Sequence, residues 1–332
     1  MVKKISLFSL TAILSFIIGY SIASFIITNK YETFIQSIST KRADNTAYPF
    51  VHPILGVTSD NAASVGEFQP LAQKVRNIFS ANASILSRYS IYFKDENNGL
   101  WFGINENDTY NPASMLKVVL AIATYKEAEA NPHFLYGERI YTPELAQLNV
   151  TLPYSLPSEL RVNQSYTIGD LVEKMLVDSD NGAKDILANT LDQNIIGNVY
   201  ANVGVNPPIN DEQYTISAKQ YSSFFKILYN GNYLNLADSN QLISILSETT
   251  FDKGIVAGVP TGTIVADKYG EYVNDSNNTP TSMELHDCGI VYLEKSPYVL
   301  CIMTEGTNEA DLSSVIAKVS QVVYNEVKNN YK

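Results

Sequence analysis

Residues 111–120 read Asn-Pro-Ala-Ser-Met-Leu-Lys-Val-Val-Leu. Asn111 is a typical N-cap residue and Pro112 suits the first helical position, so a helix is predicted to begin here. Ser114 then lies in the first turn, where backbone N–H groups without helical partners, together with the helix dipole, suit a developing oxyanion. Lys117 lies on the same helix face, and its side chain points back toward the N-terminus. We expect a half-buried lysine there to have a lowered pKa and to act as a base toward Ser114.

The pattern Ser-x-x-Lys is short and occurs twice in the chain. Ser223 and Lys226 form the second copy, but they lie in the middle of a predicted helix, where the backbone N–H groups are already bonded. For Ser114 the alternative interpretation is a solvated first-turn serine without a chemical role.

Strands are predicted toward both ends of the chain and helices between them. Hydrophobic spacing predicts helices over 68–83, from 111, and over 168–176, 182–191, 217–230, 238–248 and 312–327. The predicted strands cover 88–94, 100–104, 263–268, 286–293 and 298–304. The economical arrangement is an α/β (α+β) fold. One antiparallel sheet is built from both ends of the chain, its first and last helices cover one face, and a helical subdomain is inserted.

Two further motifs lie beyond the serine. Ser179-Asp180-Asn181 links two predicted helices, where Ser179 could relay a proton and Asn181 could bind a substrate amide and Lys117. Asp180 more plausibly holds this loop through backbone N–H groups, and a simple helix-ending polar turn is the alternative. Lys268-Tyr269-Gly270 lies on a late strand, where a glycine lets a ligand approach the strand edge. The alternative for Lys268 is an edge-strand lysine that opposes aggregation.

The order of the three motifs is more specific than any one of them. Ser-x-x-Lys at a helix start, Ser-Asp-Asn between helices and Lys-x-Gly on a strand are typical of penicillin-recognising serine enzymes. Over about residues 84–330 the chain resembles the class A β-lactamase and penicillin-binding transpeptidase-like superfamily. The resemblance implies an antiparallel sheet of about five strands flanked by the N- and C-terminal helices, with an inserted all-helical subdomain.

The resemblance also implies the roles of the site residues. Ser114 would form an acyl-enzyme with Lys117 as its base, while the other motifs would move the proton, bind the substrate amide and supply an oxyanion N–H. The implied catalytic residues are Ser114, Lys117, Ser179 and Lys268, and the implied substrate-binding residues are Asn181, Tyr269, Gly270 and Glu271. The implied partner is a cell-wall peptide or a β-lactam-like small molecule, with no cofactor.

The strand motif departs from the pattern of the superfamily. Tyr269 stands where the superfamily usually has Thr or Ser, whose hydroxyl helps to bind the substrate carboxylate. The last arginine in the chain is Arg161, so no later arginine replaces that contact. Glu271 adds a negative charge that would repel an anionic ligand. A catalytically weakened cell-wall-binding domain is therefore one alternative.

The loop that supplies the deacylating glutamate of class A β-lactamases also differs. That pattern resembles E-x-x-L-N and follows Ser-Asp-Asn by some thirty residues, but Gly204–Ser217 lacks it and Glu212 is the only glutamate in place. We therefore expect slow deacylation, which favours a D,D-peptidase-like or penicillin-binding-protein-like enzyme. A β-lactamase that uses Glu212 is the other alternative.

Composition and charge exclude several classes of protein. The chain has 332 residues, is 45% hydrophobic and carries a net charge of −11. It is too apolar for a disordered chain and too acidic for a nucleic-acid binder. The absence of CxxC, HExxH and helical carboxylate clusters predicts no metal site, and the absence of G-x-S-x-G disfavours a Ser-His-Asp hydrolase. Cys288 and Cys301 are predicted to lie diagonally on neighbouring strands, so a disulfide is possible but not favoured.

The N-terminus predicts the compartment. Residues 5–28 form an uncharged apolar run of 24 residues that follows two lysines. A bilayer span needs about 20 residues, whereas a cleaved signal peptide has a core of about 7–15. We predict a membrane anchor over 1–29, an extracytoplasmic tether over 30–67, and a serine hydrolase domain over 68–332. The protein would be single-pass with its domain outside, and the alternative is secretion after signal cleavage.

Overall fold

The structure is a computed structural model that describes residues 15–25, 38–43, 46–59, 68–151, 158–208, 214–276 and 279–330. Within the anchor predicted over 1–29, it describes a helix over 15–25, and the rest of that anchor lies outside the described residues. Across the described parts of the chain, no helix has the length and apolar character needed to cross a membrane. The boundaries of anchor, tether and domain stay predictions.

A five-stranded antiparallel sheet forms the centre of the fold, in the order β4-β3-β11-β10-β9. Its strands are β3 (Leu86–Asp95), β4 (Trp101–Ile104), β9 (Val265–Ser276), β10 (Thr279–Val291) and β11 (Tyr298–Gly306). The sheet thus joins the early hairpin to the late strands, as the sequence predicts. The strand predicted over 263–268 continues eight residues further, to Ser276.

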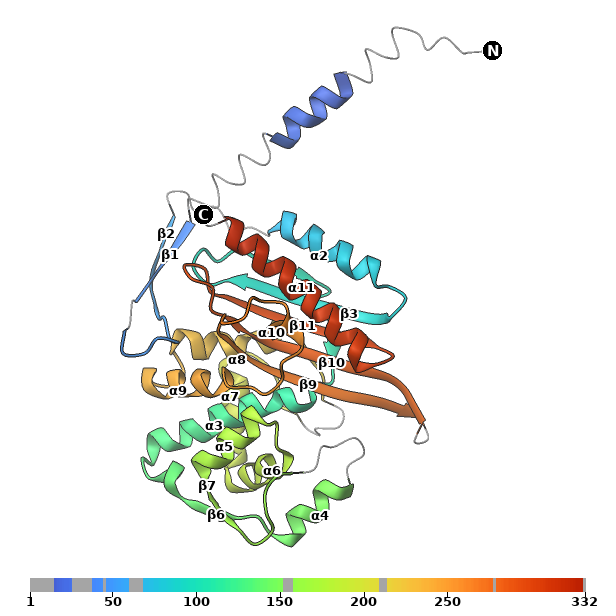
Figure 1. Cartoon of the computed structure of the whole chain (residues 1–332). Coiled ribbons are helices and arrows are strands. Elements are labelled where there is room, and N and C mark those ends of the chain that lie inside the picture. The colour runs from blue at the N-terminus through green and yellow to red at the C-terminus, as the bar shows by residue number, and fades with distance from the viewer. Residues whose placement is uncertain are drawn as a thin grey trace.

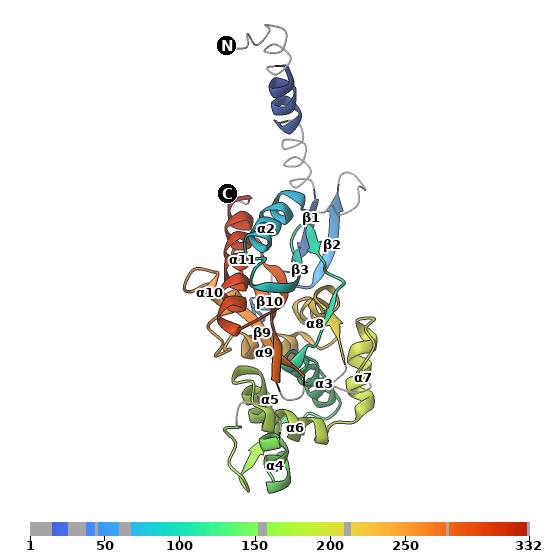
Figure 2. The same cartoon turned by 90° about the vertical axis from the view of Figure 1, so that its right-hand side faces the viewer.

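Helices cover both faces of this sheet. On one face lie α2 (Gln69–Ala81) and α11 (Glu309–Asn330), the first and last helices of the domain, with the short α10 (Gly254–Ala257) (Figure 1). On the other face and beyond it lie α3 (Lys117–Ala130), α4 (Pro143–Thr151), α5 (Ile168–Val177), α6 (Asn181–Thr190), α7 (Gln193–Asn202), α8 (Ala218–Asn230) and α9 (Leu236–Leu246). Figure 2 shows α4, α5 and α6 gathered at the end of the molecule away from α2. This is the inserted helical subdomain that the sequence predicts.

Small elements complete the subdomain. They are the paired strands β5 (Thr109–Tyr110) with β8 (Ile216–Ser217), the paired strands β6 (Glu138–Ile140) with β7 (Ser165–Thr167), and the 3₁₀ turns η1 (Ala113–Leu116) and η2 (Phe134–Tyr136).

Local signals place the helix ends correctly in most cases. Thr167 and Asp170 form the capping box at the start of α5, and Gly231 ends α8 in the left-handed conformation with φ of 56°. The start of the serine helix is different from the prediction. A 3₁₀ turn, η1, precedes α3, so Ser114 lies in η1 and Lys117 is the first residue of α3.

The register of β10 and β11 corrects the expectation for the cysteines. Cys288 lies directly opposite Cys301 rather than diagonal to it, and the two form a disulfide with a Cα–Cα distance of 4.0 Å. Val291 pairs with Tyr298, so β10 ends two residues before the predicted end at 293, and the longer connection changes the register.

Part of the segment predicted as a tether packs on the domain. Residues Ile38–Arg42 (β1) and Ile54–Ser59 (β2) form a two-stranded ribbon, and Val51 is fully buried. Arg42 donates to the Glu96 carboxylate at 2.7 Å and stacks over the Tyr229 ring. The segment is held because it supplies a buried ion pair and a buried apolar side chain to the body.

Candidate active site

The serine turn is held by side chains on both of its sides. The Asn111 side chain accepts a hydrogen bond from the Ala113 N–H, and Ala113 has a φ of 46°, in the left-handed region. The hydroxyl of Tyr221, on α8, donates to the Met115 carbonyl at 2.7 Å. These contacts fix the η1 turn and leave Ser114 half-buried at its surface.

Lys117 connects the first two motifs. Its side chain is buried at 2% exposure, and Nζ lies 3.0 Å from Ser114 Oγ, as the i to i+3 spacing predicts. Nζ also lies 3.1 Å from Ser179 Oγ and 2.7 Å from Asn181 Oδ1, and it contacts the Ser179 carbonyl oxygen. Ser114, Lys117, Ser179 and Asn181 therefore form one hydrogen-bonded cluster.

The Ser179 loop depends on Asp180 for its shape. Ser179 has a φ of 57° between α5 and α6, and Asp180 caps α6 by accepting from the Ala183 N–H. The other oxygen of Asp180 accepts from the Glu159 N–H, and Ser158 donates to the same carboxylate. The expectation that Asp180 holds the loop agrees with these contacts.

Lys268 reaches the cluster from the sheet. It is fully buried on the edge strand β9, and its Nζ donates to Ser179 Oγ at 2.9 Å. Gly270, two residues on, lies against η1, and a Cβ there would come within 2.5 Å of the Pro112 carbonyl oxygen. The glycine thus permits close packing of β9 on the serine turn, which is a structural requirement in addition to any ligand contact.

Burial shifts the pKa values of both lysines. Burial, with the neighbouring charges of Lys268 and Lys184, holds the pKa of Lys117 well below its usual range. Burial also lowers the pKa of Lys268 to about 8, although nearby carboxylates oppose the shift. The lowered pKa of Lys117 favours its free amine, which is the form that can act as a base.

The remaining predicted residues lie along β9. The Tyr269 ring stacks on Phe251, with 4.1 Å between the centroids, and its face lies 4.2 Å from Lys268 Nζ. Glu271 is exposed, and desolvation followed by the charge of Glu309 raises its pKa. The predicted candidate Glu212 lies outside the described residues.

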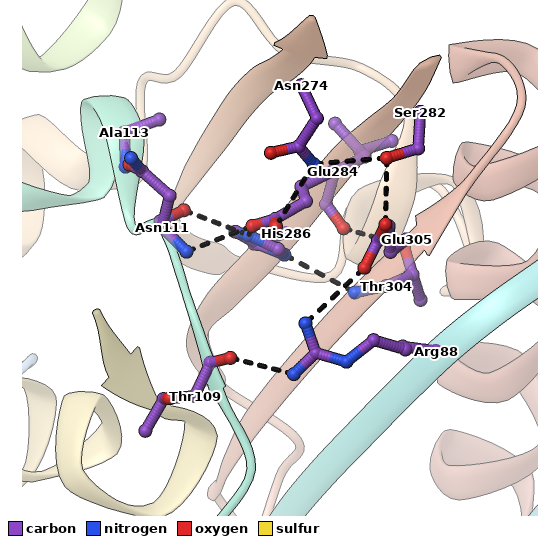
Figure 3. Close-up of polar contacts among 11 residues, drawn as sticks. Arg88, Thr109, Asn111, Ala113, Asn274, Ser282, Glu284, His286, Thr304 and Glu305 are labelled. Carbon is purple, nitrogen blue, oxygen red and sulfur yellow. Dashed lines mark hydrogen bonds and ion pairs between the residues drawn. The ribbon is translucent and has the colours of Figure 1, made fainter. Parts of the chain in front are cut away.

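A set of hydrogen-bonded polar side chains lies behind the serine turn, and it was not predicted from the sequence (Figure 3). Glu284 accepts from the Asn111 N–H at 2.9 Å, and His286 Nε2 lies 3.1 Å from the Asn111 carbonyl oxygen and 3.2 Å from Glu284. The Thr304 N–H approaches His286 Nδ1, so Nε2 carries the proton in the neutral ring. Polar residues at alternate positions of a buried strand are the sequence signal that could have indicated this support.

A second buried pair lies on β9 and β10. Asp267 and Asp287 are fully buried, and Asp287 also accepts from the Ile255 N–H at 2.7 Å. Burial and the charge of Asp287 raise the pKa of Asp267 well above its usual range. The raised pKa favours the neutral form of Asp267, which reduces the negative charge buried beside Lys268. Among the described residues, no group of His, Cys, Asp and Glu could hold a metal ion.

With this geometry established, the chain can be compared with known proteins. The sequence model described as the beta-lactamase enzyme family matches residues 70–327. The chain belongs to this beta-lactamase enzyme family. No curated protein sequence matches it.

Solved structures with a similar fold include both penicillin-binding proteins and β-lactamases. PBP-A, as a variant in an acyl-enzyme complex with penicillin G, has a TM-score of 0.68 at 19% identity, covering 80% of this chain and 99% of that chain. A β-lactamase from Chitinophaga pinensis has a TM-score of 0.67 at 22% identity, covering 77% of this chain and 99% of that chain. A class A β-lactamase from Mycobacterium abscessus has a TM-score of 0.64 at 18% identity, covering 77% of this chain and 98% of that chain. These likenesses establish the fold of this family member.

Proposed function

We propose that this protein is an active-site-serine acyl hydrolase or transferase of the D,D-peptidase type that acts on a cell-wall peptide or a related amide. The contact of Lys117 Nζ with Ser114 Oγ, inside a cluster that also holds Ser179 and Asn181, carries the proposal. A buried lysine with a lowered pKa is the base that such a serine needs.

The proposed reaction begins at the Ser114 hydroxyl. Lys117, as the free amine, takes the hydroxyl proton while Oγ forms a bond to the substrate carbonyl carbon. The carbonyl oxygen becomes an oxyanion that accepts from the backbone N–H groups of Ser114 and Glu271. As the C–N bond breaks, a proton passes through Ser179 to the leaving nitrogen, and Lys268 maintains the charge balance behind Ser179.

The acyl-enzyme would then be released by water or by an acceptor amine. The stretch 204–217 lacks the E-x-x-L-N pattern that serves deacylation in class A β-lactamases, so we propose slow release. This is why a peptidase or transpeptidase is proposed ahead of a β-lactamase.

The proposed location is the outer face of the cell membrane, with the apolar run 5–28 as a single-pass anchor and the domain outside. The disulfide between Cys288 and Cys301 supports an oxidising compartment, where such bonds persist. Secretion after cleavage of the N-terminal segment is the alternative, and it agrees equally with the disulfide.

The function is tested by intact mass of the full chain after long incubation with excess penicillin G or its methyl ester. We expect a persistent adduct on the parent protein and none on Ser114→Ala. Ser223→Ala, in the mid-helix copy of the same motif, is the matched control and should keep the adduct. Rapid turnover that depends on Ser114 would indicate a β-lactamase instead. If neither compound forms an adduct or is turned over, the acyl-enzyme proposal is refuted.

A further inference from the structure

Tyr269 occupies the space directly over the second and third motifs. Its ring lies nearly parallel to Phe251, at 13° and 4.1 Å between the centroids, so it is held from one side. On the other side Lys268 Nζ, which donates to Ser179 Oγ, lies 4.2 Å from the ring centroid. The ring is therefore fixed between a phenyl group and the two motif residues.

The ammonium group of Lys268 has no donor left for a ligand. A lysine has three N–H donors. One is directed to Ser179 Oγ at 2.9 Å, a second to the Tyr269 carbonyl oxygen at 3.3 Å, and the face of the Tyr269 ring receives the third. The side chain is also fully buried. A substrate carboxylate would have to displace the ring before it could reach this charge.

The charges around Tyr269 also oppose an anionic ligand. Glu271 is the next polar residue on β9, and desolvation followed by the charge of Glu309 raises its pKa. The ammonium group of Lys253 is already paired with Glu309. No arginine follows Arg161 in the chain. The surroundings of Tyr269 thus hold two carboxylates, Glu271 and Glu309, against the surface cation Lys253.

We propose that Tyr269 is a specificity-determining residue that excludes a carboxylate next to the scissile bond, so that the acyl donor is an amide or ester that is neutral or cationic at that position. This inference rests on the proposed function, since it names the substrate class of the same serine site. An internal peptide bond has this character, because the residue after the bond carries an amide rather than a free carboxylate. The aromatic face of Tyr269 and the carboxylate of Glu271 would favour such a group.

Two β-lactams that differ only in this charge test the proposal. The rate of Ser114 acylation of the full chain is measured by intact mass for penicillin G and for its uncharged methyl ester at equal concentration. We expect the ester to react about tenfold faster or more, because the acid meets no free donor and a negative surface. In Tyr269→Thr, the ratio of acid to ester rates should rise by about tenfold or more, since the third donor of Lys268 is freed.

Tyr269→Phe is the matched control, because it keeps the ring over Lys268 and loses only the hydroxyl; its rate ratio should remain that of the parent protein. If penicillin G acylates Ser114 of the parent protein as fast as its methyl ester, or faster, the inference is overturned. The acyl-enzyme proposal is then left intact. This comparison needs no variant, so it decides the matter even where Tyr269→Thr fails to fold. No Ser114 adduct with either compound would overturn both proposals.

Discussion

At the level of single residues, Lys117 joins the first two motifs, because its Nζ contacts both Ser114 and Asn181. The i to i+3 relation of Ser114 and Lys117 gives the observed 3.0 Å contact, because a 3₁₀ turn leading into a helix also places residues i and i+3 on one face. The pKa of Lys117 is lowered by burial and by the charges of Lys268 and Lys184, which come from distant parts of the chain. Phe251, which fixes Tyr269, had no signal in the sequence.

The pKa values of the two lysines predict a bell-shaped pH profile for acylation. Lys117 must be neutral, so the rate should rise as it loses its proton at a pH well below the usual lysine range. Lys268 must stay protonated, so the rate should fall above about pH 8. The measurement is the rate of Ser114 acylation by the methyl ester from about pH 5 to about pH 10.

Lys268→Arg tests the assignment of the falling limb, because a guanidinium group stays protonated throughout this range. The limb should disappear in this variant. The control is Lys226→Arg, since burial also lowers the pKa of Lys226 to about 8, and here the limb should remain. A falling limb that persists in Lys268→Arg would assign it to another group.

At the level of elements, the packing of β9 on η1 determines the site. Local pattern predicted a strand at Lys268 and a helix from 111, but neither the 3₁₀ turn nor its contact with β9, which depends on the missing side chain of Gly270. The same limit explains the disulfide. The strands of Cys288 and Cys301 were predicted, whereas their register depends on how the hairpin turn closes.

Gly270→Ala should therefore destabilise the fold and slow acylation. The new Cβ would meet the Pro112 carbonyl oxygen at 2.5 Å and Met115 Cγ at 2.8 Å, which forces β9 away from the serine turn. We expect a loss of about 1–3 kcal/mol in the free energy of unfolding, measured in urea. Gly197→Ala in α7 is the control, since its Cβ meets nothing within 4 Å. It should be neutral or stabilising by up to about 1 kcal/mol. Equal effects of the two variants would contradict the packing argument.

At the level of the whole molecule, the described parts of the segment before the domain, 38–43 and 46–59, pack on the body. The sequence of 30–67 has no sustained periodicity and looks like a tether, yet Arg42 and Val51 are built into the surface of the body. Isolated side chains that insert into a distant surface leave no periodic signal. A fragment that begins at residue 68 would lack both contacts.

Arg42→Met in the full chain should lower stability markedly. It would leave Glu96, whose side chain is 0% exposed, with only the more distant Lys94 at 3.5 Å. We expect a loss of about 2–4 kcal/mol, measured by urea or thermal unfolding. Lys74→Met is the control, because the Lys74–Glu326 pair is on the surface and should contribute about 0–1 kcal/mol. Comparable losses in the two variants would show that the segment is not an integral part of the body.

The sequence by itself determined the motifs, the caps of α5 and α8, the hairpins and the family resemblance. The motifs, caps and hairpins depend on residues within a few positions of one another, where backbone geometry and turn chemistry act directly, and the resemblance depends on the order of the motifs along the chain. Only the tertiary structure decided that Lys268 meets Ser179, that Cys288 faces Cys301, and that Tyr269 lies between Phe251 and Lys268. These pairs join separate segments, so their geometry follows from strand register and from the packing of whole elements, which no local pattern contains.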